Sequence, residues 1–112
     1  MIEVTENNGI VVAKFKDQDR FNSLITEPVK ETLLSYFNKP NTKLVINLNG
    51  IKFIDSSGFS VFLSIMKAAN NNYGELKICN VLPEVKELFE LLQLHNIFEI
   101  YDTQEECVKS FK

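Results

Sequence analysis

The sequence has few of the side chains from which catalytic and metal sites are usually built. It contains one histidine, His95, and two cysteines, Cys79 and Cys107, which are far apart and form no C-x-x-C pair. This spacing gives no support for a zinc site or a redox dithiol. We therefore expect two buried, reduced thiols, as in a cytosolic protein.

Clusters of basic residues and long apolar runs are also missing. The formal net charge is −3 and the lysines and arginines do not group, so we expect no nucleic acid and no anionic membrane surface as partner. No apolar run approaches the length of a membrane span, and residues 1–20 lack the apolar segment of a signal peptide. We expect a soluble, cytoplasmic protein.

Acidic residues are concentrated toward the C-terminus. Between Glu84 and Glu106 the chain has seven carboxylates and a single basic residue, Lys86. The simpler interpretation is a solvated helix face, and the alternative is one side of an electrostatic docking surface.

The composition and the periodicity of the apolar residues predict one small α/β domain over residues 1–112. Of these residues 45% are hydrophobic and 11% aromatic, which is typical of a globular chain. The pattern gives the order ββαβαβαβα, with strands over residues 2–5, 10–15, 43–48, 75–79 and 97–101 and helices over about 26–37, 57–70, 83–92 and 103–111. Alternating strands and helices imply a mixed, mostly parallel sheet, and an Asn-Gly turn joins the first two strands in a hairpin.

Several local signals refine this prediction. Residues 16–23 form a polar connection, and residues 51–54 continue the apolar signal after a turn at Asn49 and Gly50. Thr26 is a candidate N-cap of the first helix, and Thr103 begins a capping box for the last.

The segment Asp55-Ser56-Ser57-Gly58 stands where a buried strand becomes a helix. We expect Ser56 at the cap and Ser57 in the first turn, where free N–H groups and the positive end of the helix dipole favour an anion. A phosphorylated serine is therefore compatible with this position. The alternative is purely structural: Asp55 ends the strand, Ser56 caps the helix and Gly58 permits a close approach.

The sequence contains no motif that indicates an enzyme active site. Ser57 lacks the G-x-S-x-G context, and only His95 could serve as a histidine base. Neither a Walker A sequence nor G-x-G-x-x-G occurs, and Asp55 has no partner carboxylates at ligand spacing. We expect no catalytic residue, no metal and no cofactor.

The helix that follows has an unusually wide apolar face. Eight apolar residues cover more than half of its circumference: Phe59, Val61, Phe62, Leu63, Ile65, Met66, Ala68 and Ala69. A helix that packs one face on a sheet needs a stripe of only about 100°. Either neighbouring elements cover the excess, or it is exposed beside Ser57 for a partner.

Three segments, residues 47–58, 82–92 and 97–106, resemble the STAS domains of bacterial anti-sigma factor antagonists. The chain departs from the usual pattern at residues 17–22 and at Phe59, where the family commonly has leucine. The resemblance implies that the unphosphorylated protein binds an anti-sigma factor with serine kinase activity and so releases a sigma factor. It also implies that this kinase phosphorylates Ser57 and that a serine phosphatase reverses the reaction.

From the segment and the wide helix face, we expect partner contacts at Asp55, Ser56, Ser57, Gly58, Phe59 and Phe62. Phosphate in such an interface should weaken binding and leave the fold intact. The alternative is a STAS module that is never phosphorylated and serves as an interaction subunit of a transport or scaffold complex.

Overall fold

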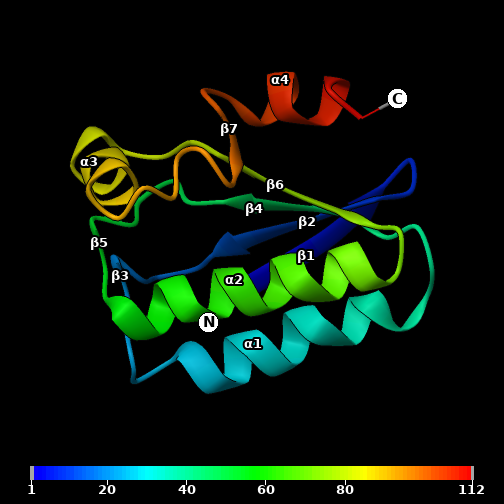
Figure 1. Ribbon diagram of the computed structural model, residues 1–112, viewed down its shortest axis with the longest axis horizontal. Helices are drawn as coiled ribbons and strands as arrows, with labels where there is room; N and C mark the ends of the chain where they lie inside the picture. The colour runs from blue at the N-terminus through cyan, green and yellow to red at the C-terminus, as the bar shows by residue number, and fades with distance from the viewer. Residues whose placement is uncertain (1, 112) are drawn as a thin grey trace.

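A five-stranded sheet forms the centre of the protein, which a computed structural model describes over residues 2–111 (Figure 1). The strand order is β1-β2-β4-β6-β7, and only the β1–β2 pair is antiparallel. The strands are β1 (Ile2–Asn7), β2 (Ile10–Phe15), β4 (Lys43–Asn47), β6 (Glu75–Cys79) and β7 (Glu99–Tyr101). Asn8 and Gly9 turn the chain between β1 and β2, both with positive φ, as their Asn-Gly sequence predicts. The predicted α/β class and hairpin are confirmed.

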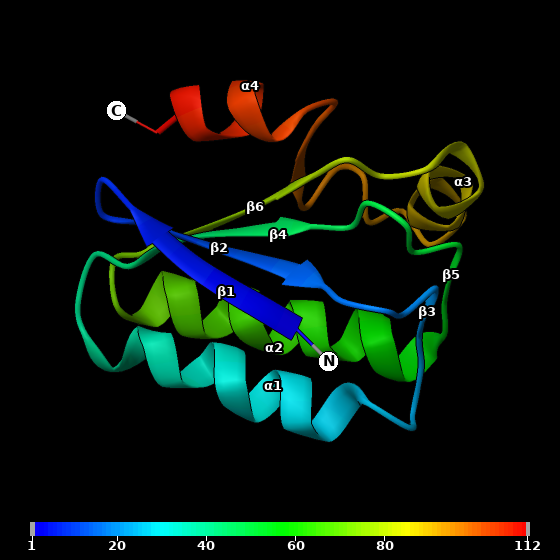
Figure 2. The ribbon, with the colours of Figure 1, turned by 180° about the vertical axis from the view of Figure 1, so that it is seen from behind.

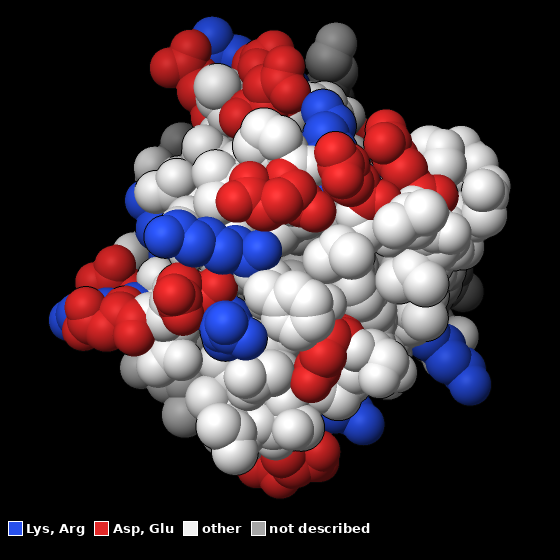
Figure 3. Space-filling view, turned by 90° about the vertical axis from the view of Figure 1, so that its left-hand side faces the viewer, with Lys and Arg blue, Asp and Glu red and all other residues white. Residues whose placement is uncertain are grey.

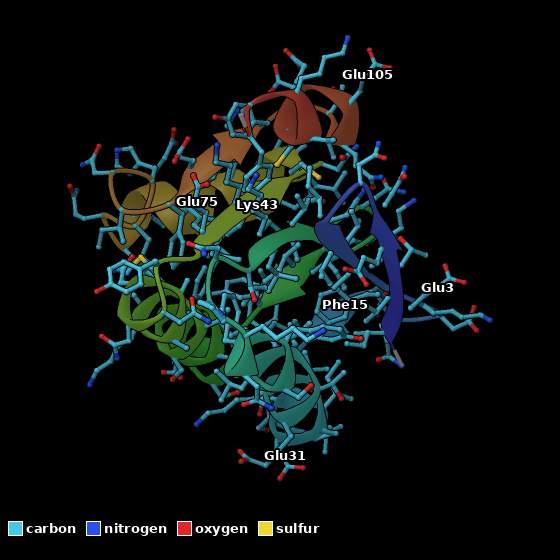
Figure 4. All side chains as sticks on the ribbon, turned by 90° about the vertical axis from the view of Figure 1, so that its right-hand side faces the viewer. Glu3, Phe15, Glu31, Lys43, Glu75 and Glu105 are labelled. Carbon is cyan, nitrogen blue, oxygen red and sulfur yellow. The ribbon has the colours of Figure 1, made fainter. Side chains whose placement is uncertain are left out.

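The helices lie on both sides of this sheet and at its end. Helix α1 (Thr26–Leu34), which continues as a 3₁₀ turn (Ser35–Asn38), and α2 (Ser56–Asn71) cover one face (Figures 1 and 2). The short α4 (Gln104–Lys109) covers the other face, and α3 (Pro83–Leu91) lies beyond the ends of the parallel strands. Figure 4 shows these layers from the side: Glu105 points outward from α4 and Glu31 outward from α1, on opposite sides of the sheet.

A small second sheet, which the sequence did not predict, connects the layers near the start of α2. Strand β3 (Arg20–Phe21) pairs in parallel with β5 (Phe53–Ile54). We predicted residues 16–23 as a polar connection, but Phe21 within it is fully buried. A two-residue strand is too short to show a period, and its partner is distant in the chain.

The main core lies between the sheet and the α1–α2 layer. It is rich in aromatic contacts: the Phe62 ring lies 5.3 Å from Phe21, and the Phe59 ring meets Phe89 edge-on at 5.1 Å. The wide apolar face of α2 is mostly covered, since Phe59, Val61, Phe62, Ile65 and Ala69 are buried. Of its large apolar residues Leu63 is exposed, at 38%, and Met66 is partly exposed. The first of the two alternatives for this face therefore holds.

A smaller core fills the space between the sheet and α4. Its buried members are Ile10, Val12, Val45, Cys79, Cys107 and Phe111. Cys79 and Cys107, distant in sequence, thus lie in one cluster, and both are free thiols. Sequence distance was no guide to their separation in space.

The helix termini agree with prediction only in part. Thr103 caps α4 as expected, and its Oγ1 accepts the Glu106 N–H at 3.1 Å. Thr26 is not a cap: it is buried as the first residue of α1, and Ile25 precedes it without a side-chain hydrogen bond. Over residues 2–111, none of the helices has the combined length and apolarity to cross a bilayer.

Candidate partner-binding site at the start of α2

Asp55 makes the junction between β5 and α2. It has extended backbone angles (φ −91°, ψ −178°), and its Oδ1 accepts the Gly58 N–H at 3.0 Å. This is the geometry of an N-cap, which satisfies one of the helix's free N–H groups. We predicted Ser56 as the cap. In the structure β5 ends at Ile54, Asp55 is the cap and Ser56 is already the first residue of α2.

The Asp55 carboxylate connects three segments of the chain. Besides Gly58 it accepts a hydrogen bond from the Ser57 hydroxyl, with Oγ and Oδ1 2.5 Å apart. Its second oxygen accepts the Ser23 N–H at 3.1 Å, which holds the loop before α1 against the start of α2. The pKa of Asp55 is lowered, and the hydrogen bond from the Ser57 hydroxyl is the largest cause. Desolvation by burial raises the pKa, and the backbone N–H donors lower it further. Asp55 is therefore ionised at neutral pH.

Ser56 and Ser57 differ in exposure and in contacts. Ser56 is exposed, whereas Ser57 is half-buried and its Oγ–H is directed at Asp55. The Ser57 oxygen is thus held in a defined place at a helix N-terminus, and its side chain retains access to solvent. An anion attached there would meet the positive end of the α2 dipole on one side and the Asp55 carboxylate on the other.

Three of the predicted contact residues are buried. A Cβ at Gly58 would lie 2.7 Å from Ile54 Cγ2 and 2.8 Å from the Phe21 carbonyl oxygen, so glycine lets α2 approach β3 and β5. Phe59 is 5% exposed and Phe62 fully buried. In this structure these residues attach the start of α2 to the core and leave little surface for a partner, so their contact with one stays a prediction.

Two exposed apolar residues beside this junction were missed. Leu24 is 85% exposed and follows Ser23, the residue bound to Asp55; Phe53 is 42% exposed on β5, with the Arg20 guanidinium 5.8 Å from its ring centre. Isolated apolar residues in a loop and a two-residue strand give no periodic signal. We call the group Leu24, Phe53, Asp55, Ser56 and Ser57 the Ser57 surface.

Charges are mixed around this end of the molecule. Figure 3 looks onto the end where β3, β5 and the start of α2 lie, and uncharged side chains occupy much of its centre. Acidic groups are more frequent in the upper part of this view, toward α3 and α4. Among residues 2–111, no three His, Cys, Asp or Glu side chains gather closely enough to hold a metal ion.

Comparison with known proteins identifies the domain. The family model of STAS domains matches residues 1–107. The anti-sigma F factor antagonist of Paenibacillus polymyxa is 38% identical over 104 residues, covering 92% of this chain and 87% of that protein.

Solved structures agree on the fold. An anti-sigma-factor antagonist (STAS) domain protein from Planctomyces limnophilus has a TM-score of 0.89 at 21% identity, covering 97% of this chain and 96% of that one. The Bacillus cell fate determinant SpoIIAA, in its phosphorylated form, has a TM-score of 0.74 at 16% identity over 100% of both chains. The chain belongs to the STAS domain family, and its relatives there include anti-sigma factor antagonists.

Proposed function

We propose that this chain is an anti-sigma factor antagonist that binds an anti-sigma factor with serine kinase activity through the Ser57 surface. Binding of the unphosphorylated form releases the sigma factor. The observation that carries the proposal is the Ser57 hydroxyl, held at the start of α2 by Asp55, with the exposed apolar residues Leu24 and Phe53 on the adjoining loop and strand. The relationship to the Paenibacillus anti-sigma F factor antagonist supports the class of partner.

Ser57 is the residue that we propose as the phosphate acceptor. Phosphorylation replaces the hydroxyl proton now shared with Asp55 and adds about −1.5 to −2 charges at neutral pH. The α2 dipole stabilises such a charge by about 0.3–1 kcal/mol. Repulsion by Asp55 offsets this gain, since two unit charges 4 Å apart interact by about 1 kcal/mol in water and about 4 at an effective dielectric of 20.

The fold tolerates this charge because the side chain of Ser57 reaches solvent. A phosphate there can turn away from Asp55 and remain hydrated. A docked partner would remove that water from both anions, and an uncompensated buried charge costs about 3–5 kcal/mol. We therefore expect phosphorylation to lower partner affinity by at least about a hundredfold.

The chemistry belongs to the partners in this proposal. The anti-sigma factor transfers the phosphoryl group from ATP to Ser57 Oγ, and a serine phosphatase removes it. The antagonist presents the acceptor oxygen in a fixed place, and Asp55 accepts its proton in a hydrogen bond.

Phosphotransfer and binding test the proposal together. The chain is incubated with its candidate anti-sigma factor and ATP, and the modified peptide is identified by mass spectrometry. Ser57→Ala should bind without being modified, and Ser57→Asp should bind poorly. Ser60→Ala, on the exposed side of α2 one turn further along, is the matched control and should behave as wild type. Phosphate on another residue, or equal affinity of the two Ser57 variants, would contradict the proposal.

A further inference from the structure

A polar pocket lies where the parallel strands end on the α4 side of the sheet. It has a volume of about 390 Å³, and every residue that lines it is polar: Lys14, Asn47, Asn49, Asn80 and Gln104. Lys14 and Asn47 are register partners on β2 and β4. Asn80 directly follows β6, and Gln104 is the first residue of α4. We call this group the Lys14 pocket, and it shares no residue with the Ser57 surface.

The register of the sheet explains why these side chains gather. Alternate residues of a strand share one face, so Lys14 lies on the same side of the sheet as Val12. Asn47 lies on the side of Val45 for the same reason. Both valines belong to the small core beneath α4, which therefore ends in a polar rim at the carboxyl ends of the strands. Figure 1 shows α4 starting toward those ends, where ligands of open α/β sheets characteristically bind.

Asn47 gives the Lys14 pocket a fixed floor. It is 5% exposed, and both ends of its side-chain amide are engaged. Its Oδ1 accepts the Asn49 N–H at 2.9 Å, and its Nδ2 donates to Gln104 Oε1 at 2.9 Å. These bonds hold the loop after β4 and the start of α4 together. They also orient Gln104: its oxygen is engaged, and no acceptor among residues 2–111 takes a hydrogen bond from its Nε2.

The remaining groups in the Lys14 pocket combine positive charge with polar amides. None of the lining residues is acidic, and across residues 2–111 no carboxylate pairs with the Lys14 ammonium group. Asn80 contributes an acceptor, since its Oδ1 is buried without a hydrogen-bond partner. Buried acceptors normally pair with a donor. The pocket therefore fits a ligand that carries both a negative charge and hydroxyl donors.

We propose that the Lys14 pocket binds a small phosphorylated sugar or polyol, with its phosphate at Lys14 and its hydroxyl groups on the amides of Asn49, Asn80 and Gln104. Small-molecule pockets usually have volumes of about 300–1,000 Å³ and a mainly apolar lining. This one is at the lower end of that range and has no apolar lining residue, so its occupant is the size of a monosaccharide and polar throughout. Lysine binds phosphate as a point charge, and side-chain amides both donate to and accept from hydroxyl groups.

Titration of the ¹⁵N-labelled full chain, followed by NMR, tests this proposal. The probes are glucose 6-phosphate, ribose 5-phosphate and glycerol 3-phosphate. For at least one of them the backbone amide signals of Asn47, Asn49, Asn80 and Gln104 should shift and saturate, with a dissociation constant of about 1 mM or lower. The Ser57 amide signal should stay in place. The unphosphorylated sugar or polyol, and inorganic phosphate, titrated separately at equal ionic strength, should each bind at least about tenfold more weakly.

Lys14→Met tests the phosphate contact. The Lys14 side chain is exposed and methionine keeps most of its aliphatic length, so the variant should fold and bind the best probe at least about tenfold more weakly. Lys67→Met is the matched control, because Lys67 is also exposed but lies on α2, on the opposite side of the sheet; its affinity should equal that of wild type. No saturating shift with any of the three probes would overturn the proposal. So would equal affinity for inorganic phosphate, or equal losses in the two lysine variants.

Discussion

Replacing Asp55 by alanine removes the side chain that joins β5, α2 and the loop before α1. Loss of an N-cap costs about 0.5–2 kcal/mol. A typical hydrogen bond contributes about 0.5–1.5 kcal/mol to stability. We expect the bonds from Ser57 and Ser23 to contribute toward the lower end of this range, because the site is partly exposed. We expect Asp55→Ala to lower the free energy of unfolding by about 1–3 kcal/mol.

Asp55→Asn separates capping from charge. Asparagine caps helices about as well as aspartate, so its oxygen can still accept the Gly58 N–H. What it loses is the interaction of a negative charge with the helix dipole, about 0.3–1 kcal/mol. The expected order of stability is therefore wild type, then Asp55→Asn, then Asp55→Ala.

Urea unfolding followed by circular dichroism measures this order. For a domain of this size the slope is about 1–3 kcal/mol per molar, so Asp55→Ala should unfold at a midpoint lower by about 1 M. Equal midpoints for wild type and Asp55→Ala at neutral pH would refute the reasoning, because the cap would then contribute nothing.

The pH dependence gives an independent check. The folded-state pKa of Asp55 is lowered, so its charge contributes stability above the unfolded-state pKa of about 3.9. That contribution is lost as the pH falls through the lower folded-state value. The difference between wild type and Asp55→Asn should be constant from neutral pH to about 5 and shrink below about 4.

Two further predictions concern the residues around this junction. Gly58→Ala places a Cβ 2.7 Å from Ile54 Cγ2 and 2.8 Å from a backbone oxygen. We expect the free energy of unfolding in urea to fall by about 1–3 kcal/mol. Unchanged stability would contradict the close packing. Leu24→Ser combined with Phe53→Ser should weaken partner binding at least about tenfold while the thermal midpoint stays within a few degrees. The control is Tyr73→Ser, just beyond the C-terminal end of α2, where the side chain is as exposed as that of Leu24; equal losses for the control and the double variant would contradict a localised interface.

Much of the fold followed from the sequence because its apolar periods are long and regular. The hairpin, the central strand β4 and the helices have enough residues to show a repeat of 2 or 3.6. Strands β3 and β5 have two residues each and form only by pairing with one another, which no local pattern encodes.

The local geometry of the candidate site was predicted only in part. The hydroxyl and carboxylate at Asp55–Ser57 stand where expected, since a strand-to-helix junction is a local feature. The burial of Phe59 and Phe62 could not be decided from the sequence, because a wide apolar face looks the same there whether a partner or the protein's own elements cover it. That Cys79 and Cys107 belong to one buried cluster depends on where α4 returns to the sheet, which is a property of the tertiary structure.

The most direct measurement compares one anti-sigma factor's affinity for two forms of this chain, one unmodified and one carrying phosphate only on Ser57. Titration calorimetry on both, with thermal unfolding alongside, separates lost docking from lost structure. We predict an affinity lower by at least about a hundredfold for the phosphorylated form and melting curves that nearly coincide. Equal affinities, or a phosphorylated chain that has unfolded, would contradict the switch.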